Sequence, residues 1–292
     1  KKQNKTDEMI IEYERLMDTG SRDTDSLKDL AKAYGQQGRV DEQISVLKKI
    51  LKINPTDTTV QSELARAYED SGEDPLELFK ARFEENPENA SYAVEYADKL
   101  MSNGDTSDAI DVLENTLSYN RENSMIYMTL GKAYNENSDF GDAVDILKDL
   151  FDLDRNNFRV AMLISVNSIE IDDFDSAFEW AEKSMKISKN NAESLAHMGN
   201  LYYKAMQSCR EDAFSRSDKI VASLAYEYFV KAEQKGNSKY YKQKSWLEEN
   251  EVLFAYSDWF MTDKDIQATG KVSPVGRCYN WVSESLAKQS DW

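Results

Sequence analysis

The sequence predicts an all-α fold built from consecutive pairs of antiparallel helices. The main observation is a fixed period between Ala90 and Asn191, with three units of equal length that begin at Ala90, Ser124 and Phe158. Within these units a turn residue and an alanine recur in register, at Gly104, Ser138 and Asp172 and at Ala109, Ala143 and Ala177. A second observation is that only 4 of the 292 residues are proline, which suits a chain dominated by helices.

The middle unit shows the pattern most fully. Its first half carries Tyr127, Leu130, Gly131 and Tyr134, and its second half carries Phe140, Ala143, Leu147 and Leu150. This arrangement resembles the tetratricopeptide repeat (TPR), whose period is about 34 residues. The resemblance implies a right-handed α-solenoid of helix-turn-helix units, in which each unit buries its apolar stripe against the next. It also implies that a small residue such as Gly131 lets the two helices of a unit approach closely.

The pattern divides the chain in order from its beginning. Residues 1–23 predict a half-repeat, because Met9, Tyr13 and Leu16 fall on positions of a second helix. Six units follow, at residues 24–57, 58–89, 90–123, 124–157, 158–191 and 192–237. The second helix of the 58–89 unit is about two residues short and begins near Pro75, a favoured residue at a helix start.

The last part of the chain departs from the period. The sixth unit holds an insertion at residues 204–219, which predicts a longer first helix and a loop around Cys209 to Asp218. Residues 238–292 predict a capping helix or two, followed by a short irregular or β-like tail. Within that tail we expect a small extended or hairpin element over residues 266–285, which include the aromatic and β-branched run from Cys278 to Val282, and then a short final helix.

Composition excludes several classes of function. The net charge of −18 argues against binding to nucleic acid or to an anionic membrane surface, since both favour a basic face. No apolar run approaches the roughly 18 residues that a membrane-spanning helix needs. The single histidine, His197, is expected to be a packed or solvated helix residue, and no metal-ligand spacing, cofactor motif or nucleophile with a nearby histidine is present. The sequence therefore predicts no enzyme, no cofactor and no metal site.

The TPR resemblance places a concave groove along the first helices. Carried over by register, the residues predicted to line it are Lys28, Lys32, Arg66, Val94, Met101, Met125, Met128, Lys132, Asn135, Arg159, Met162, Val166, Ile169, Asn200 and Tyr203. The set is rich in apolar side chains and methionine, which suit a surface that must fit an apolar peptide or helix. Its cations suit carboxylates on such a ligand.

These residues predict a scaffold or adaptor that binds a peptide or protein segment in the groove. The alternative is a structural or self-assembling module, whose own C-terminal tail fills the groove and whose N-terminal face joins another subunit. Fold alone names no partner.

Cys209 and Cys278 both lie outside the regular repeats. If they pair, the bond ties the tail to the sixth unit and indicates an oxidising compartment, whereas free thiols would suit the cytosol equally. The chain starts at Lys1 without methionine, and its turn-rich tail is similar to the ends of some exported bacterial TPR proteins. These features favour an exported protein, periplasmic or at the cell surface, over a cytoplasmic one.

Overall fold

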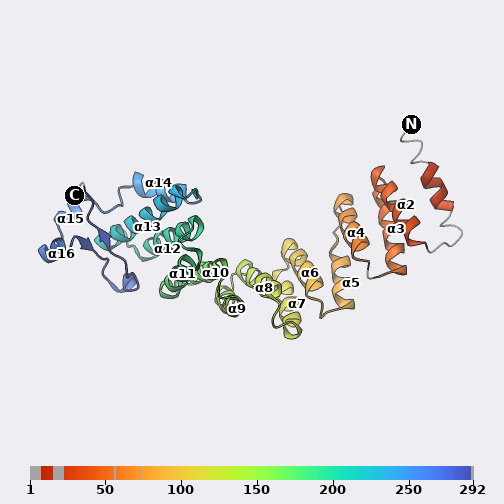
Figure 1. Ribbon diagram of the computed structural model, residues 1–292, viewed down its shortest axis with the longest axis horizontal. Helices are drawn as coiled ribbons and strands as arrows, with labels where there is room; N and C mark the ends of the chain where they lie inside the picture. The colour runs from red at the N-terminus through yellow and green to blue at the C-terminus, as the bar shows by residue number, and fades with distance from the viewer. Residues whose placement is uncertain (1–7, 16–22, 56, 73, 291–292) are drawn as a thin grey trace. The chain divides into compact units, whose positions relative to one another are not determined.

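The structure is a computed structural model that describes residues 8–15, 23–55, 57–72 and 74–290. The chain divides into two compact units, residues 1–99 and residues 100–292. Within each unit the helices follow one another as antiparallel pairs (Figure 1).

The first unit packs its helices around a continuous apolar core. Leu30, Leu47 and Ile50 are fully buried there. The helices are α2 (Thr24–Gln36), α3 (Val40–Ile53), α4 (Thr58–Ser71) and α5 (Leu76–Glu85), followed by the beginning of α6 (Ala90–Asn103). The described part of the predicted half-repeat, residues 8–15, is helical, and its Ile10 is buried in the same core. Leu16, like the rest of residues 16–22, lies outside the described residues.

The second unit continues the pairs from the end of α6. Its helices are α7 (Thr106–Tyr119), α8 (Ser124–Glu136), α9 (Phe140–Leu153), α10 (Phe158–Glu170), α11 (Phe174–Ser188), α12 (Ala192–Cys209) and α13 (Arg216–Gln234). We call α2, α4, α6, α8, α10 and α12 the first helices of their pairs and α3, α5, α7, α9, α11 and α13 the second helices. The first helices α8, α10 and α12 begin at Ser124, Phe158 and Ala192, which are the first residues of three predicted repeats.

Polar residues at the joints explain why the helices begin and end where they do. Asn123, Asn157 and Asn191 stand one repeat apart, and each side chain accepts a hydrogen bond from a backbone N–H of the helix that follows. Between the helices of a pair, Ser138 and Asp172 adopt positive φ angles of 66° and 55°. That backbone reverses the chain after the first helix, and short polar residues tolerate it better than bulky ones.

Two glycines allow close contact between the helices of a pair. A Cβ atom added at Gly131 of α8 would lie 2.9 Å from Leu147 Cδ2, and one at Gly199 of α12 would lie 2.7 Å from Phe229 Cδ1. The predicted role of Gly131 in helix approach therefore has a structural basis. The crowding at Gly199 also involves the backbone oxygen of Ala225, at 3.1 Å, which cannot turn aside as a side chain can.

The insertion in the sixth repeat lengthens both of its helices. Helix α12 has 18 residues against 13 in α10, and α13 has 19 against 15 in α11. The loop between α12 and α13 is consequently short, at residues 210–215, and α13 already begins at Arg216. The predicted longer first helix and the loop after it are both present. The loop is shorter than the predicted Cys209 to Asp218, because Ser215 caps α13 and the helix begins at Arg216.

Short elements close the second unit after α13. They are α14 (Tyr241–Glu249), α15 (Tyr256–Phe260), α16 (Lys264–Thr269), strand β1 (Lys271–Val272), the 3₁₀ turn η1 (Arg277–Tyr279) and strand β2 (Leu286–Ala287). Strands β1 and β2 pair antiparallel, with Val272 opposite Leu286. This strand pair is the extended or hairpin element that the sequence predicts for the tail, although Cys278–Val282 itself is not extended and residues 283–290 form no helix. Tyr279, Trp281 and Val282 are all buried, and a tight turn, in which Trp281 Nε1 donates to the carbonyl of Cys278, brings them inward together.

The tail is fixed to the last repeats by aromatic rings and by a disulfide. Trp281 stacks on Tyr202 with ring centroids 5.7 Å apart and packs against Phe178 at 5.5 Å. Cys209 and Cys278 form a disulfide with Cα atoms 6.0 Å apart. This tail therefore covers the end of the second unit, where an unfinished repeat would otherwise expose apolar surface.

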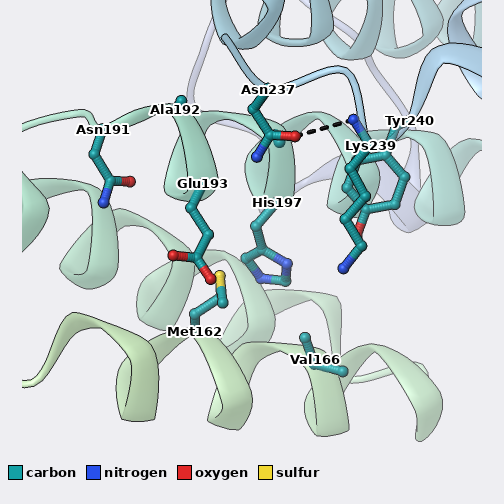
Figure 2. Close-up of a pocket in the computed structure, with 10 residues that line it drawn as sticks. Met162, Val166, Asn191, Ala192, Glu193, His197, Asn237, Lys239 and Tyr240 are labelled. Carbon is teal, nitrogen blue, oxygen red and sulfur yellow. Dashed lines mark hydrogen bonds between the residues drawn. The ribbon is translucent and has the colours of Figure 1, made fainter. Parts of the chain in front are cut away.

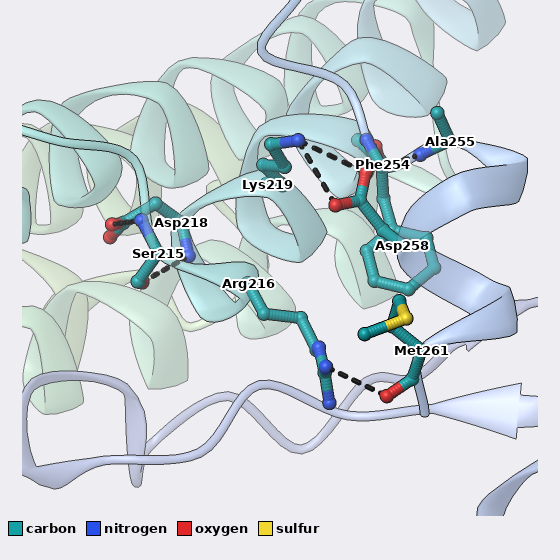
Figure 3. A network of polar contacts seen from close by, with 9 residues as sticks. Ser215, Arg216, Asp218, Lys219, Phe254, Ala255, Asp258 and Met261 are labelled. Carbon is teal, nitrogen blue, oxygen red and sulfur yellow. Dashed lines mark hydrogen bonds and ion pairs between the residues drawn. The ribbon is translucent and has the colours of Figure 1, made fainter. Parts of the chain in front are cut away.

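A polar network fastens the capping segment to the beginning of α13 (Figure 3). Ser215 and Asp218 form a reciprocal capping box at the start of that helix. Lys219 Nζ lies 3.0 Å from Asp258, whose carboxylate also accepts the backbone N–H of Ala255 at the start of α15. Arg216 donates to the carbonyl of Met261 at 2.9 Å. The first turn of α13 thus holds α15 through charged side chains.

Candidate functional site

In the first unit three of the predicted groove residues are cations, which lie on α2 and α4. Lys28 of α2 lies 2.7 Å from Asp57, the residue whose carboxylate caps α4. The hydrogen bond between Lys28 and Asp57 raises the pKa of Lys28 and lowers the pKa of Asp57. Lys32 and Arg66 are exposed. Lys28 therefore has a partner within the chain, which leaves Lys32 and Arg66 as the more open cations of the three.

In the second unit the predicted residues share one side of the first helices. Met125 and Met128 of α8 are exposed, at 43% and 36%. Arg159 lies 3.3 Å from Glu193, the residue at the equivalent position of the next repeat. Asn135 donates to Asn167 at 2.7 Å, and Lys132 lies 3.8 Å from Glu136. Neighbouring first helices are thus linked by polar contacts along this side.

Three predicted groove residues do not line an open surface. Val94, Met101 and Ile169 are buried, with exposed fractions of 9%, 8% and 5%. Ile169 belongs to the large apolar core of the second unit. The register places these residues on the first helices, where they are buried among neighbouring side chains.

A pocket of about 440 Å³ lies where α10 and α12 meet the segment between α13 and α14 (Figure 2). Two of the predicted groove residues, Met162 and Val166, come to it from α10. Its other lining residues are Asn191, Ala192, Glu193, Ala196, His197, Asn237, Lys239 and Tyr240. We call this the Met162 pocket. Its size is within the range of roughly 300–1,000 Å³ that is usual for ligand sites.

The wall of the Met162 pocket contains a neutral histidine. Burial lowers the pKa of His197 to about 4, with a smaller contribution from the positive charge of Lys239. The Ser165 hydroxyl donates to the carbonyl of Ala177 at 2.6 Å, so its only proton is in use. His197 Nε2, 2.8 Å from the Ser165 oxygen, must therefore donate to it, and Nδ1 is left as an acceptor. Ser165 and His197 consequently do not form a nucleophile–base pair.

Donors surround the rest of the Met162 pocket. The side-chain oxygens of Asn191 and Asn237 accept hydrogen bonds from the backbone N–H groups of Ser194 and Lys239. The side-chain NH₂ group of each asparagine therefore points away from the hydrogen bond that its oxygen accepts. Figure 2 shows the Lys239 side chain extending past Tyr240 toward the space in front of His197. The pocket can therefore offer an ammonium and amide donors to carbonyl or carboxylate oxygens, above an apolar floor of methionine and valine.

The remaining predicted residues lie outside the Met162 pocket. The ring of Tyr203 packs edge-on against Trp246 of α14, with centroids 6.0 Å apart, so the capping helix covers this position. Asn200 is half-buried on α12. The tail itself packs elsewhere, because Trp281 and Tyr279 contact Phe178, Tyr202 and Asp218.

Sequence reasoning missed several residues of this site. Asn191 had a signal, since an asparagine cap precedes α8, α10 and α12 alike. Asn237, Lys239 and Tyr240 follow the last repeat and have no register to place them. Across the described ranges, no cluster of three potential metal ligands occurs, and no helix is long and apolar enough to cross a membrane.

Family models of the tetratricopeptide repeat match the chain at residues 100–166 and 27–57. No curated protein matches the chain significantly. Among solved structures, the C-terminal part of a TPR repeat-containing protein from Cytophaga hutchinsonii is similar over 83% of this chain and 95% of its own, with 14% identity and a TM-score of 0.57. PilF of Pseudomonas aeruginosa covers 78% of this chain and 99% of its own, at 18% identity and a TM-score of 0.48. A MamA protein covers 58% and 94%, at 20% identity and a TM-score of 0.47. The family-model matches, which fall on regularly repeated helix pairs, identify the chain as a tetratricopeptide repeat protein.

Proposed function

We propose that the protein is a non-enzymatic scaffold that binds a peptide or protein segment along the first helices of its second unit, with the Met162 pocket at the centre. The observation that carries the proposal is the composition of this pocket. An apolar floor of Met162 and Val166 lies beside the ammonium of Lys239 and the neutral acceptor of His197. An apolar side chain next to a carboxylate, on a backbone that has its own N–H groups, would satisfy all three features.

The exposed methionines of α8 support the same proposal. Met125 and Met128 occupy the positions that Arg159 and Met162 occupy one repeat later. Methionine is flexible and polarizable, so it adapts to apolar ligands of different shape. A bound segment that extended from the Met162 pocket toward α8 would cover these two side chains.

The test is a selection from a phage-displayed library of random dodecapeptides against the whole chain. We expect the selected peptides to combine an apolar residue with a carboxylate, and Lys239→Glu to weaken their binding at least tenfold. Lys242→Glu is the matched control, because Lys242 is exposed on the neighbouring helix α14 and does not line the pocket. Peptides that bind the Lys239→Glu variant as well as the original chain would contradict the proposal.

The disulfide supports a further part of this proposal, the compartment. Disulfides persist mainly in oxidising environments. We therefore infer that the protein acts outside the reducing cytosol, and we expect Cys209 and Cys278 to be found joined in protein taken from its natural source.

Self-association through the N-terminal face stays a prediction. Its support is that Met9 and Ile11 of the helix at residues 8–15 are exposed, at 38% and 50%.

A further inference from the structure

A second hollow, of about 500 Å³, lies in the first unit between α3 and α5, with α4 as its floor. Its apolar surface comes from Leu51 of α3, Leu64 and Tyr68 of α4, and Leu78 of α5. We call it the Leu78 hollow. It lies on the second helices α3 and α5, so it shares no residue with the predicted groove or with the Met162 pocket.

The two helices that border the Leu78 hollow differ in length. Helix α5 has 10 residues, whereas α3, the preceding second helix, has 14. The difference is about one helical turn. The side chains of Lys48, Leu51 and Lys52 of α3 border one side of the hollow, and α5 borders the other from Glu77 to Glu85.

Two buried polar atoms in the wall of the Leu78 hollow have no hydrogen-bond partner, Gln61 Oε1 and Arg82 Nε. Both residues are more than nine-tenths buried. The Gln61 amide is oriented by its Nε2, which donates to the carbonyl of Pro55 at 2.6 Å, so the oxygen remains as an acceptor. Arg82 uses Nη1 on Glu95 at 2.7 Å, and its Nε–H remains as a donor. A buried polar group without a hydrogen-bond partner is unfavourable, so a ligand that supplies a donor and an acceptor would be favoured.

The charges around the Leu78 hollow indicate the sign of the ligand. Lys48 and Lys52 lie one turn apart on α3, both are exposed, and neither forms an ion pair within the described part of the chain. Arg82 is paired with Glu95, and Glu77 and Glu85 lie on α5, so Lys48 and Lys52 make the α3 side of the hollow locally positive in a chain of net charge −18. A carboxylate on the ligand would find two ammonium groups at the rim.

We propose that the Leu78 hollow is a second binding site, which takes a peptide segment with a carboxylate side chain next to an apolar one. The apolar side chain lies against Leu51, Leu64 and Leu78, and the carboxylate pairs with Lys48 and Lys52. Gln61 Oε1 needs a hydrogen-bond donor and Arg82 Nε needs an acceptor. A free carboxylate supplies only acceptors, and a hydrocarbon supplies neither a donor nor an acceptor. A peptide has an N–H for Gln61 and a C=O for Arg82, so its backbone satisfies both orphaned atoms.

The test uses the full chain with isotope-labelled leucine methyl groups, titrated with acetyl-Leu-Asp-Leu-Glu-amide and followed by NMR. We expect the methyl signals of Leu51, Leu64 and Leu78 to shift and saturate. The uncharged analogue acetyl-Leu-Asn-Leu-Gln-amide should bind at least tenfold more weakly. The double variant Lys48→Glu/Lys52→Glu should lose at least tenfold in affinity for the acidic peptide.

Lys49→Glu is the control, since Lys49 is exposed on the same helix and does not line the hollow. It should bind as the original chain does. Ala81→Trp, which places a ring into the hollow from an exposed position, should abolish binding. Unchanged leucine signals in the original chain, or equal losses in Lys49→Glu and the double variant, would overturn the proposal. If glutarate bound as tightly as the acidic peptide, with the same dependence on Lys48 and Lys52, the hollow would be a site for small acids and the peptide proposal would be wrong.

Discussion

The imidazole of His197 is buried at 3% exposure and has its Nε2 against the Ser165 hydroxyl. A lone histidine on a helix predicts a packed or solvated residue, and the packed alternative is the one found. The sequence could not show the partner, because Ser165 lies in the preceding repeat and the two meet only when α10 and α12 pack together. The same burial keeps the ring neutral at physiological pH.

This burial predicts a pH dependence of stability. In the unfolded chain His197 binds a proton below its ordinary pKa of 6.5, whereas in the folded chain it does so only below about 4. The free energy of unfolding should therefore fall as the pH is lowered from 6.5 to 4, by up to about 3 kcal/mol from this group. Urea unfolding of the original chain and of His197→Gln at several pH values measures the effect. Carboxylates titrate in both proteins, so the difference isolates His197, and parallel curves would contradict the prediction.

Ile169 and Met101 show a limit of predicting groove residues from the register of a repeat. The register gave their helix and their approximate side, and both lie on the predicted first helices. It could not give what covers them, because burial depends on side chains from other elements. Met125 and Met128, in the same class of position, are exposed.

At the scale of elements, periodicity separates what could be predicted from what could not. The starts of α8, α10 and α12 follow from asparagine caps and apolar positions that recur once in every repeat. Residues 271–290 have no such repeat, and their conformation depends on rings of distant helices such as Phe178 and Tyr202. Their fold was therefore predicted only as irregular or β-like, and the expected final helix is wrong.

Removal of the tail should destabilise the second unit without opening a groove. A chain that ends at Asp263 lacks Trp281 and the disulfide, and it exposes the rings of Phe178 and Tyr202. Trp281→Ala alone should lower the free energy of unfolding by about 3–5 kcal/mol, since it leaves a large cavity in a buried aromatic cluster. Tyr256→Ala, at an exposed position, is the control and should change stability little. If the shortened chain stayed folded and bound more of the selected peptides, the tail would be a plug of the groove.

At the scale of the whole molecule, the two units differ in how they are held. The first unit relies on small and branched apolar side chains such as Leu30 and Leu47. The second adds the aromatic cluster around Trp281 and a disulfide. In repeat proteins each element is stabilised by its neighbours, so local stability follows local packing.

Reduction of the disulfide should act on the second unit alone. The bond joins cysteines with a sequence separation of 69, and loss of such a constraint costs about 2–4 kcal/mol. Hydrogen exchange with and without a reducing agent should show less protection in α12 and α13 and unchanged protection in α2 and α3. The double variant Cys209→Ser/Cys278→Ser should show the same protection as the reduced protein, and the reducing agent should not change it. Equal losses in both units would show that they unfold as one.

The position of that disulfide also determines how the molecule responds to force. A pull between the two ends of the chain is transmitted through the bond from Cys209 to Cys278. Helices α13 to α16 lie between these cysteines, so tension bypasses their backbone while the bond is intact. The regular repeats before Cys209 can then be extended one after another, while the cap gives no added length. Under tension the repeats before Cys209 can therefore unfold while the C-terminal cap stays compact.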